Sequence, residues 1–163
     1  MDFIKPATMT IALSLGSGIA VAGTSTDTFT VTTDVIDACA ITADDLDFGN
    51  YSSISGSNVD AASLIDVTCS NGTSYAVALN PGTTAGAAFT ARLMTDGSNT
   101  LEYNLYTTAP RTSVWGDGTG ATVTVSGTGS GLLQSLTVYG RIAASQTVPV
   151  GSYSDTVTAT ISF

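Results

Sequence analysis

The sequence predicts an all-β protein, built as a sandwich or a barrel. Short runs of alternating apolar and polar residues recur along the chain, and turn-forming clusters such as Asp-Gly and Gly-Asp-Gly-Thr-Gly separate them. No stretch longer than a turn or two has helical periodicity. Many short strands at such spacing are typical of all-β folds, and 163 residues are enough for one domain with a substantial core.

The first 22 residues are expected to be a secretory signal peptide. Lys5 is the only positive charge before an apolar stretch, and Ala20 and Ala22 occupy the −3 and −1 positions of an A-x-A cleavage site. The apolar stretch is too short for a membrane-spanning helix and is interrupted by glycines. We therefore expect removal of residues 1–22 and export of the mature protein.

Residues 23–37 form a separate segment with a clear strand pattern. Phe29, Val31, Thr33 and Val35 share one parity, while threonine and aspartate dominate the other. Because β-branched residues favour an extended backbone, this segment is predicted to be extended, with one apolar face.

The central part of the chain contains the runs expected to build the domain. They are SLIDVTC (63–69), SYAVALN (74–80), FTARLMT (89–95), LEYNLYT (101–107), ATVTVSG (121–127) and LLQSLTVYGRI (132–142). Each alternates between apolar and polar residues over at least part of its length, as a half-buried strand does.

The final stretch, residues 151–163, is a strand pattern without an obvious neighbour. Its apolar parity comprises Tyr153, Val157, Ala159, Ile161 and Phe163. No further strand-forming run follows in the sequence, so the open side of this strand needs another partner. The N-terminal segment described above is a candidate for it.

Cys39 and Cys69 are the only cysteines. In an exported protein they are expected to form a disulfide, closing a loop of about 30 residues and stabilising the fold by roughly 3 kcal/mol. Two buried free thiols are the alternative. Zinc binding is set aside, because two cysteines without histidine cannot complete the usual ligand set.

Composition and motifs argue against an enzyme. The chain has no histidine and a net charge of −9, which excludes histidine-dependent triads and disfavours nucleic acid and anionic membranes. The glycines of 127–131 lack the lysine of a phosphate loop. Asp44, Asp45 and Asp47 lack EF-hand spacing, so a solvated turn is preferred to a calcium site. We expect no catalytic residue, metal or cofactor.

Five motifs occur in a fixed order along the chain: DLDFGNY, VTCSNGTSY, YNLYTTAPRTSVWGDGTG, LTVYGRI and GSYSDTVTATISF. This ordered set resembles spore coat U domain proteins, a group that includes the pilins of archaic, Csu-type chaperone–usher pili. The resemblance runs from about Phe29 to Phe163, nearly the whole expected mature chain.

The resemblance implies an immunoglobulin-like sandwich over residues 38–163 that lacks its last strand. A groove beside the final strand would be filled first by a periplasmic chaperone and then, at an outer-membrane usher, by the N-terminal extension of another pilin subunit. The expected donor residues are Phe29, Val31, Thr33 and Val35. The expected acceptor and chaperone-binding residues, with the terminal carboxylate anchored by the chaperone, are Val157, Ala159, Ile161 and Phe163.

The function implied is that of a structural subunit of an extracellular adhesive pilus at the cell surface. One alternative is a secreted spore-coat or matrix protein that uses similar strand exchange. Another is a monomeric carbohydrate-binding module, with Trp115, Tyr103, Tyr106 and Tyr139 as a stacking platform. Tyr103 shares its parity with Leu101 and Leu105, which favours a core position for it.

Overall fold

The computed structural model of the protein describes residues 22–163, and every regular element within them is a strand. Two units are distinguished, Met1–Asp34 and Val35–Phe163. In the first unit, residues 22–34 are exposed and belong to no strand. The expected signal peptide lies, apart from its last residue, outside the described residues. In that described part, no helix has the length and apolar character needed to cross a membrane.

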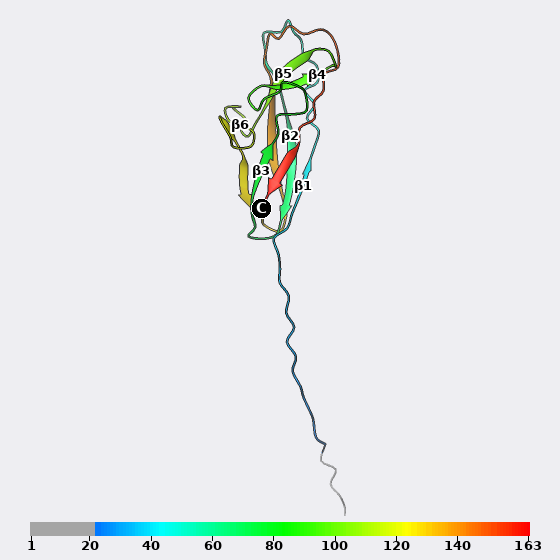
Figure 1. Ribbon diagram of the computed structural model, residues 1–163, viewed down its shortest axis with the longest axis vertical. Helices are drawn as coiled ribbons and strands as arrows, with labels where there is room; N and C mark the ends of the chain where they lie inside the picture. The colour runs from blue at the N-terminus through cyan, green and yellow to red at the C-terminus, as the bar shows by residue number, and fades with distance from the viewer. Residues whose placement is uncertain (1–21) are drawn as a thin grey trace, which may run out of the picture. The chain divides into compact units, whose positions relative to one another are not determined.

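The second unit contains two sheets (Figure 1). The larger sheet has the order β1 (Cys39–Ala43), β2 (Val59–Cys69), β9 (Leu133–Ile142), β5 (Thr100–Tyr106), β6 (Val114–Trp115) and β7 (Thr122–Val123), with β4 (Arg92–Thr95) also paired to β5. The smaller sheet has the order β10 (Ala159–Ser162), β3 (Ser74–Leu79) and β8 (Val125–Thr128). The all-β prediction is confirmed for the described residues.

The antiparallel pair β2–β9 is the longest ladder of the larger sheet. It extends from Val59 opposite Ile142 to Thr68 opposite Leu133. Along β2, Ile65, Val67 and Cys69 are buried, and the residues between them are not. This alternation is the one expected from the sequence. The buried side chains of both sheets form one hydrophobic core.

A buried arginine and the single tryptophan tie the two sheets together. The Trp115 indole is fully buried and donates from Nε1 to the carbonyl of Val77, 2.9 Å away, linking β6 to β3. Arg92, also fully buried, donates to the carbonyl oxygens of Asn80 and Trp115 at 2.9 and 2.7 Å. It also donates to Oδ1 of Asn104 at 2.7 Å. Burial lowers the pKa of Arg92, and the acceptors on Asn80, Asn104 and Trp115 satisfy its buried charge.

The prediction of one continuous strand over residues 121–127 is wrong, because this stretch forms two strands in different sheets. The chain crosses from one sheet to the other at Thr124, so β7 pairs in parallel with β6 while β8 pairs with β3. Local alternation carries no information about which sheet a strand joins, because that depends on partners distant in sequence.

Candidate functional site

The candidate site is a groove along the seam between the two sheets. β1 is an edge of the larger sheet, β10 is an edge of the smaller one, and the two lie near each other (Figure 1). Among residues 22–163, β1 pairs only with β2, and β10 pairs only with β3. Two strand edges with free backbone groups therefore flank the same opening.

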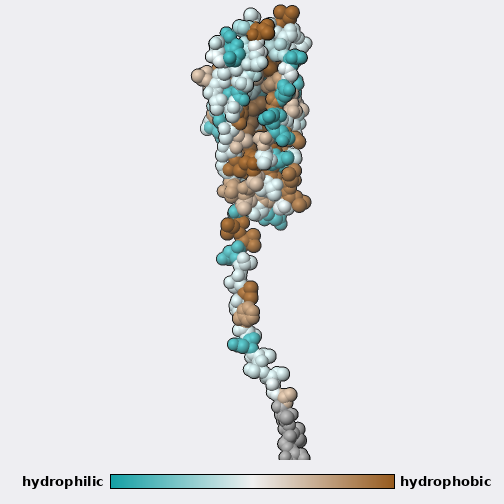
Figure 2. Space-filling model, turned by 90° about the vertical axis from the view of Figure 1, so that its right-hand side faces the viewer, coloured by the Kyte–Doolittle hydropathy of each residue, from teal (hydrophilic) through white to brown (hydrophobic). Residues whose placement is uncertain are grey.

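The cavity at this seam has a volume of about 1060 Å³. Its walls are residues 43–51, which begin at the last residue of β1, and residues 148–157, which precede β10. Its floor is made of core side chains, namely Ile65, Leu79, Met94, Leu101, Tyr103, Leu105, Val138 and Ile142. Figure 2 faces this side of the domain and shows apolar side chains recessed between more polar ones. The hydrophobic core is thus accessible along the seam.

The wall formed by residues 43–51 is held by one aromatic side chain, one turn and one long-range hydrogen bond. The Phe48 ring meets the Tyr103 ring edge-on, with centroids 6.0 Å apart. It lies so close over Gly140 that a Cβ there would come within 2.7 Å of the Phe48 ring. Asp47 accepts a hydrogen bond from the amide of Gly49 at 2.7 Å, and the Tyr51 hydroxyl accepts one from the amide of Gln146 at 2.7 Å.

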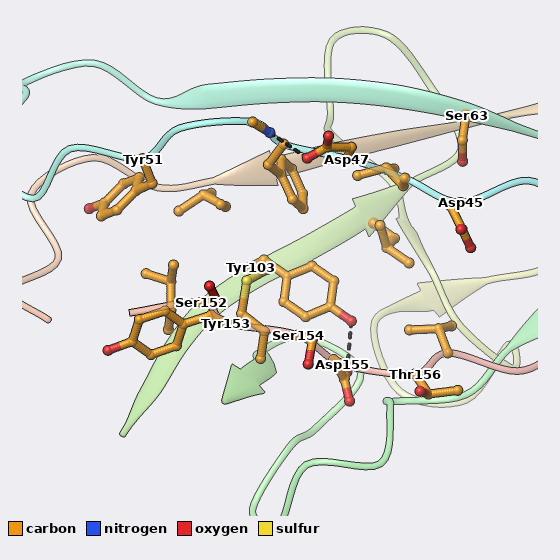
Figure 3. Close-up of a pocket in the computed structure, with 18 of the residues that line it drawn as sticks. Asp45, Asp47, Tyr51, Ser63, Tyr103, Ser152, Tyr153, Ser154, Asp155 and Thr156 are labelled. Atoms are coloured by element: carbon orange, nitrogen blue, oxygen red, sulfur yellow. Dashed lines mark hydrogen bonds between the residues drawn. The ribbon is translucent and has the colours of Figure 1, made fainter. Parts of the chain in front are cut away.

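The opposite wall is held by Asp155 (Figure 3). Its carboxylate accepts a hydrogen bond from the Tyr103 hydroxyl at 2.8 Å and from the backbone amides of Thr83 and Thr84 at 2.9 and 3.1 Å. The hydroxyls of both threonines donate to the same carboxylate at 3.2 Å. Gly82 has a φ of +97°, and a Cβ there would overlap the Asp155 carboxylate. Asp155 thus joins this wall to the core and to a neighbouring loop.

These contacts shift the pKa of both partners. Burial raises the pKa of Tyr103, and its hydrogen bond to Asp155 raises it further. For Asp155, burial acts to raise the pKa, but hydrogen bonds from the Tyr103 hydroxyl and from the amides of Thr83, Thr156 and Thr84 outweigh it, so the pKa is lowered. The carboxylate is therefore charged and the phenol neutral near neutral pH, which suits a structural hydrogen bond.

The four residues expected on the acceptor strand occupy different positions. Val157 and Ala159 are half-buried and line the groove. Ile161 is half-buried opposite Val77 in the ladder with β3, and it packs against the core outside the groove lining. Phe163 is 61% exposed and does not line the groove. Sequence reasoning missed the wall at residues 43–51, although Leu46 and Phe48 alternate within its motif.

The four expected donor residues are available to an outside partner. Phe29, Val31 and Val35 are almost fully exposed, Thr33 is exposed as well, and none of the four belongs to a strand. Their role as donors stays a prediction.

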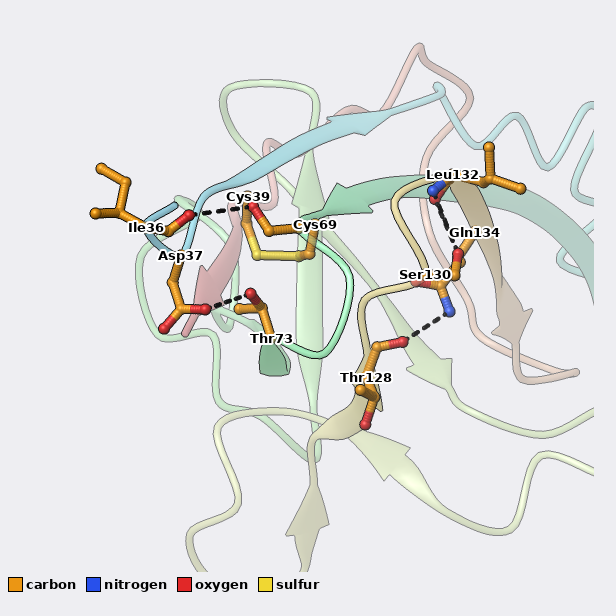
Figure 4. The surroundings of a disulfide bond; sticks show 10 residues. Ile36, Asp37, Cys39, Cys69, Thr73, Thr128, Ser130, Leu132 and Gln134 are labelled. Atoms are coloured by element: carbon orange, nitrogen blue, oxygen red, sulfur yellow. Dashed lines mark hydrogen bonds between the residues drawn. A yellow bond between two sulfur atoms is a disulfide. The ribbon is translucent and has the colours of Figure 1, made fainter. Parts of the chain in front are cut away.

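The Cys39–Cys69 disulfide is present, which excludes the alternative of two free thiols. It joins the first residue of β1 to the last residue of β2, with their Cα atoms 4.1 Å apart (Figure 4). The hydroxyl of Thr73 donates to the Asp37 carboxylate at 2.5 Å beside it. The disulfide therefore fixes the start of β1 at one end of the sandwich.

Two of the four aromatic side chains considered for a sugar-stacking platform are unavailable for that role. Trp115 is fully buried and Tyr103 is 6% exposed, so neither ring can stack on a sugar. The Tyr139 ring carries the Arg111 guanidinium 5.8 Å from its centroid. The Trp115 indole instead lies between the two sheets, where it donates to the carbonyl of Val77.

Comparison with known protein families identifies the family of this domain. The Spore Coat Protein U domain matches residues 25–160. The chain belongs to this family. The expected resemblance is thereby confirmed.

A protein sequence and a solved structure are similar to this Spore Coat Protein U domain. It is 33% identical over 129 residues to Protein U of Myxococcus xanthus, covering 72% of this chain and 71% of that protein. It is also similar to a chain in the crystal structure of the CsuC–CsuE chaperone–tip adhesion subunit pre-assembly complex, from the archaic chaperone–usher Csu pili of Acinetobacter baumannii. That similarity has a TM-score of 0.58 and 26% identity, and it covers 79% of this chain but 40% of the other.

Proposed function

We propose that this protein is a structural subunit of an extracellular adhesive fibre, assembled by donor-strand exchange through a chaperone–usher pathway. The observation that carries the proposal is the groove, whose floor is the hydrophobic core and whose walls, residues 43–51 and 148–157, adjoin the edge strands β1 and β10. An extended peptide that enters such a groove gains main-chain hydrogen bonds from the edges and pockets for alternate side chains.

The N-terminal segment has the properties required of the inserted strand. Phe29, Val31 and Val35 share one parity and are exposed. Burying three large apolar side chains contributes on the order of 5–9 kcal/mol. From Phe29 to Val35 an extended chain spans roughly 20 Å, which suits the long seam between β1 and β10. Thr33 lies on the same parity and would occupy a shallower or polar pocket.

Strand insertion can be repeated without limit when each subunit inserts its N-terminal segment into the groove of another subunit. The donated segment and the acceptor groove are different surfaces, so the contact is heterologous and generates an open filament instead of a closed ring. Before insertion, an open core with free edges is prone to aggregation. A periplasmic chaperone that occupies the groove, with an outer-membrane usher that releases the subunit, supplies the protection that this state needs.

A second candidate function is a secreted spore-coat or matrix protein that uses the same strand exchange. The observation in its favour is the similarity to Protein U of Myxococcus xanthus. Co-expression with a periplasmic chaperone from a chaperone–usher system separates the two. A stable complex between the chaperone and this chain supports the role as a fibre subunit. If cells form the polymer without such a complex, the role as a coat protein is supported.

The proposal is tested by placing a charge on each face of the donor segment in turn. Val31→Asp would bury an unpaired charge in the groove, whereas Thr30→Asp on the opposite parity would keep its charge in water. Unboiled secreted material from the unaltered chain and from Thr30→Asp is expected to give a ladder of oligomers on a denaturing gel, because an inserted strand leaves slowly.

Val31→Asp is expected to lose the ladder while its subunit is still produced. A full ladder from Val31→Asp, or no ladder from the unaltered chain, would contradict donor-strand exchange by this segment.

A further inference from the structure

The N-terminal segment is anchored at its base by several contacts within the second unit (Figure 4). The hydroxyl of Ser70 donates to the carbonyl of Ile36 at 3.4 Å, and the amide of Ser70 donates to the carbonyl of Ala38 at 2.8 Å. The Thr73 hydroxyl donates to the Asp37 carboxylate. The contacts of the folded domain with the N-terminal segment thus begin at Ile36, one residue after the last expected donor residue.

This anchoring leaves little free chain between two subunits joined by strand exchange. If Val35 lies in the groove of the acceptor, no residue separates it from Ile36 of the donating domain. If the register is shifted so that Thr33 is the last inserted residue, two residues remain, and a residue spans at most about 3.6 Å. The end of the donating domain must therefore abut the acceptor where the strand enters.

The topology indicates which ends of the two domains meet. β2 runs the length of the sandwich, on the order of 35 Å for its eleven residues, from Val59 to Cys69. The anchored base lies at the Cys69 end. The rim of the groove lies at the Val59 end, because Ile142, which lines the groove, pairs with Val59.

When the inserted strand is antiparallel to β10, its C-terminal end lies at the Val59 end of the groove. The donating domain, which follows that end in the sequence, then also lies at the Val59 end. A parallel strand would bring the donating domain to the Cys69 end, where the acceptor's own extension departs, and the two would collide. The antiparallel direction is therefore the one that allows a filament. It places the Cys69 end of one subunit against the Val59 end of the next.

Exposed apolar side chains lie at both of these ends, as Figure 2 shows. At the Cys69 end, Ile36 is exposed together with Leu132 and Leu133, which are 72% and 62% exposed. Leu133 pairs with Thr68 of β2, which places it beside the disulfide. At the Val59 end, Ile54 and Val150 are almost fully or fully exposed. Val150 lines the groove, and so does Ser53, the residue before Ile54.

We propose, building on the proposed function, that these two sets form a second contact between consecutive copies of this chain. The base surface, comprising Ile36, Leu132 and Leu133, packs against the rim surface, comprising Ile54 and Val150, of the subunit that accepts the strand. Singly exposed apolar residues are ordinary on protein surfaces. Here the short connection brings two groups of them together, and burying both from water favours a fixed angle at each joint.

The contact is tested by cysteine cross-linking in assembled fibres. Two double variants are made, Leu132→Cys with Val150→Cys and Leu133→Cys with Ile54→Cys. All four positions are exposed, so the fold tolerates the changes. The matched control combines Leu132→Cys with Leu64→Cys, because Leu64 is an exposed apolar residue in the middle of β2.

Each sample is run unboiled, to detect strand exchange, and boiled after mild oxidation, with and without reductant. At least one test pair is expected to convert a major share of subunits into multimers that survive boiling and disappear on reduction. The control pair is expected to give at least five-fold less. A Leu132→Ser, Leu133→Ser variant is expected to retain the unboiled ladder but to form fibres with a shorter persistence length in electron micrographs.

The outcomes separate this inference from the proposed function. An unboiled ladder without boiling-resistant multimers from either test pair would overturn the second contact and leave strand exchange intact. Equal cross-linking by the control pair would also overturn it. Absence of the unboiled ladder from the unaltered chain would overturn the proposed function and this contact with it.

Discussion

Replacing Asp155 tests whether the wall of the groove is held by hydrogen bonds. The carboxylate accepts from the buried Tyr103 hydroxyl at 2.8 Å and from two amides and two hydroxyls of Thr83 and Thr84. In Asp155→Ala, the hydroxyl of Tyr103, a residue 6% exposed, loses its hydrogen-bond acceptor. An unsatisfied buried hydroxyl costs about 1–3 kcal/mol.

The loop amides contribute less than the phenol. The Thr83 amide lies in an exposed contact and the Thr84 amide in a half-buried one, so water can replace part of what they lose. Adding about 1 kcal/mol for them, we expect Asp155→Ala to lower the free energy of unfolding by about 2–4 kcal/mol. Asp155→Asn keeps an oxygen for the loop, and its amide can donate to Tyr103, so about half that loss is expected.

The assay is urea unfolding followed by the fluorescence of Trp115, the only tryptophan and a fully buried one. With a urea dependence of about 2 kcal/mol per molar, the midpoint of Asp155→Ala should fall by about 1–2 M. Asp117→Ala is the matched control. Its exposed carboxylate accepts from the Thr119 amide at 2.9 Å, and its removal should leave the midpoint unchanged. Equal midpoints for Asp155→Ala and Asp117→Ala would refute the reasoning.

Two further predictions use the same assay. Arg92→Met should lower the midpoint more than Asp155→Ala, by about 3 kcal/mol or more, because the carbonyl of Trp115 and Oδ1 of Asn104 lose their buried donor; a midpoint within 0.5 M of the unaltered chain, on the order of 1 kcal/mol, contradicts this. Stability should be flat from about pH 7 to 5, since the chain has no histidine, and should fall as pH drops from about 4 toward about 2. The pKa of Asp155 is lowered, and hydrogen bonds from Asn99 and Ser98 lower that of Asp96 to about 2. Carboxylates with a lowered folded-state pKa stabilise the fold above their unfolded pKa and lose that contribution as pH falls through the folded value; a midpoint that rises on acidification would exclude this account.

Alternation in the sequence predicted the exposure of the last stretch as far as Ser162, but not that of Phe163, which is 61% exposed. Val157, Ala159 and Ile161 are half-buried and the residues between them are exposed. This works because successive side chains of an extended chain point to opposite sides, whatever lies on either side. The disulfide was predictable for a different reason, since Cys39 and Cys69 are the only cysteines in the sequence.

The groove wall at residues 43–51 was not predictable in this way. These residues form no ladder beyond β1, and their position depends on the Phe48 ring packing over Gly140, which is 92 residues away in the sequence. Arg92 was likewise indistinguishable from a surface cation, because its acceptors on Asn80, Asn104 and Trp115 lie 12 to 23 residues away in the sequence.

The sequence by itself determined that the protein is all-β, which faces of its strands are apolar, and that an unpaired strand pattern precedes the domain. Only the tertiary structure decided that β1 and β10, at opposite ends of the domain sequence, border one opening onto the core. The physical reason is that the direction of a side chain is a local property of the backbone, whereas the meeting of two sheet edges depends on the packing of every strand between them.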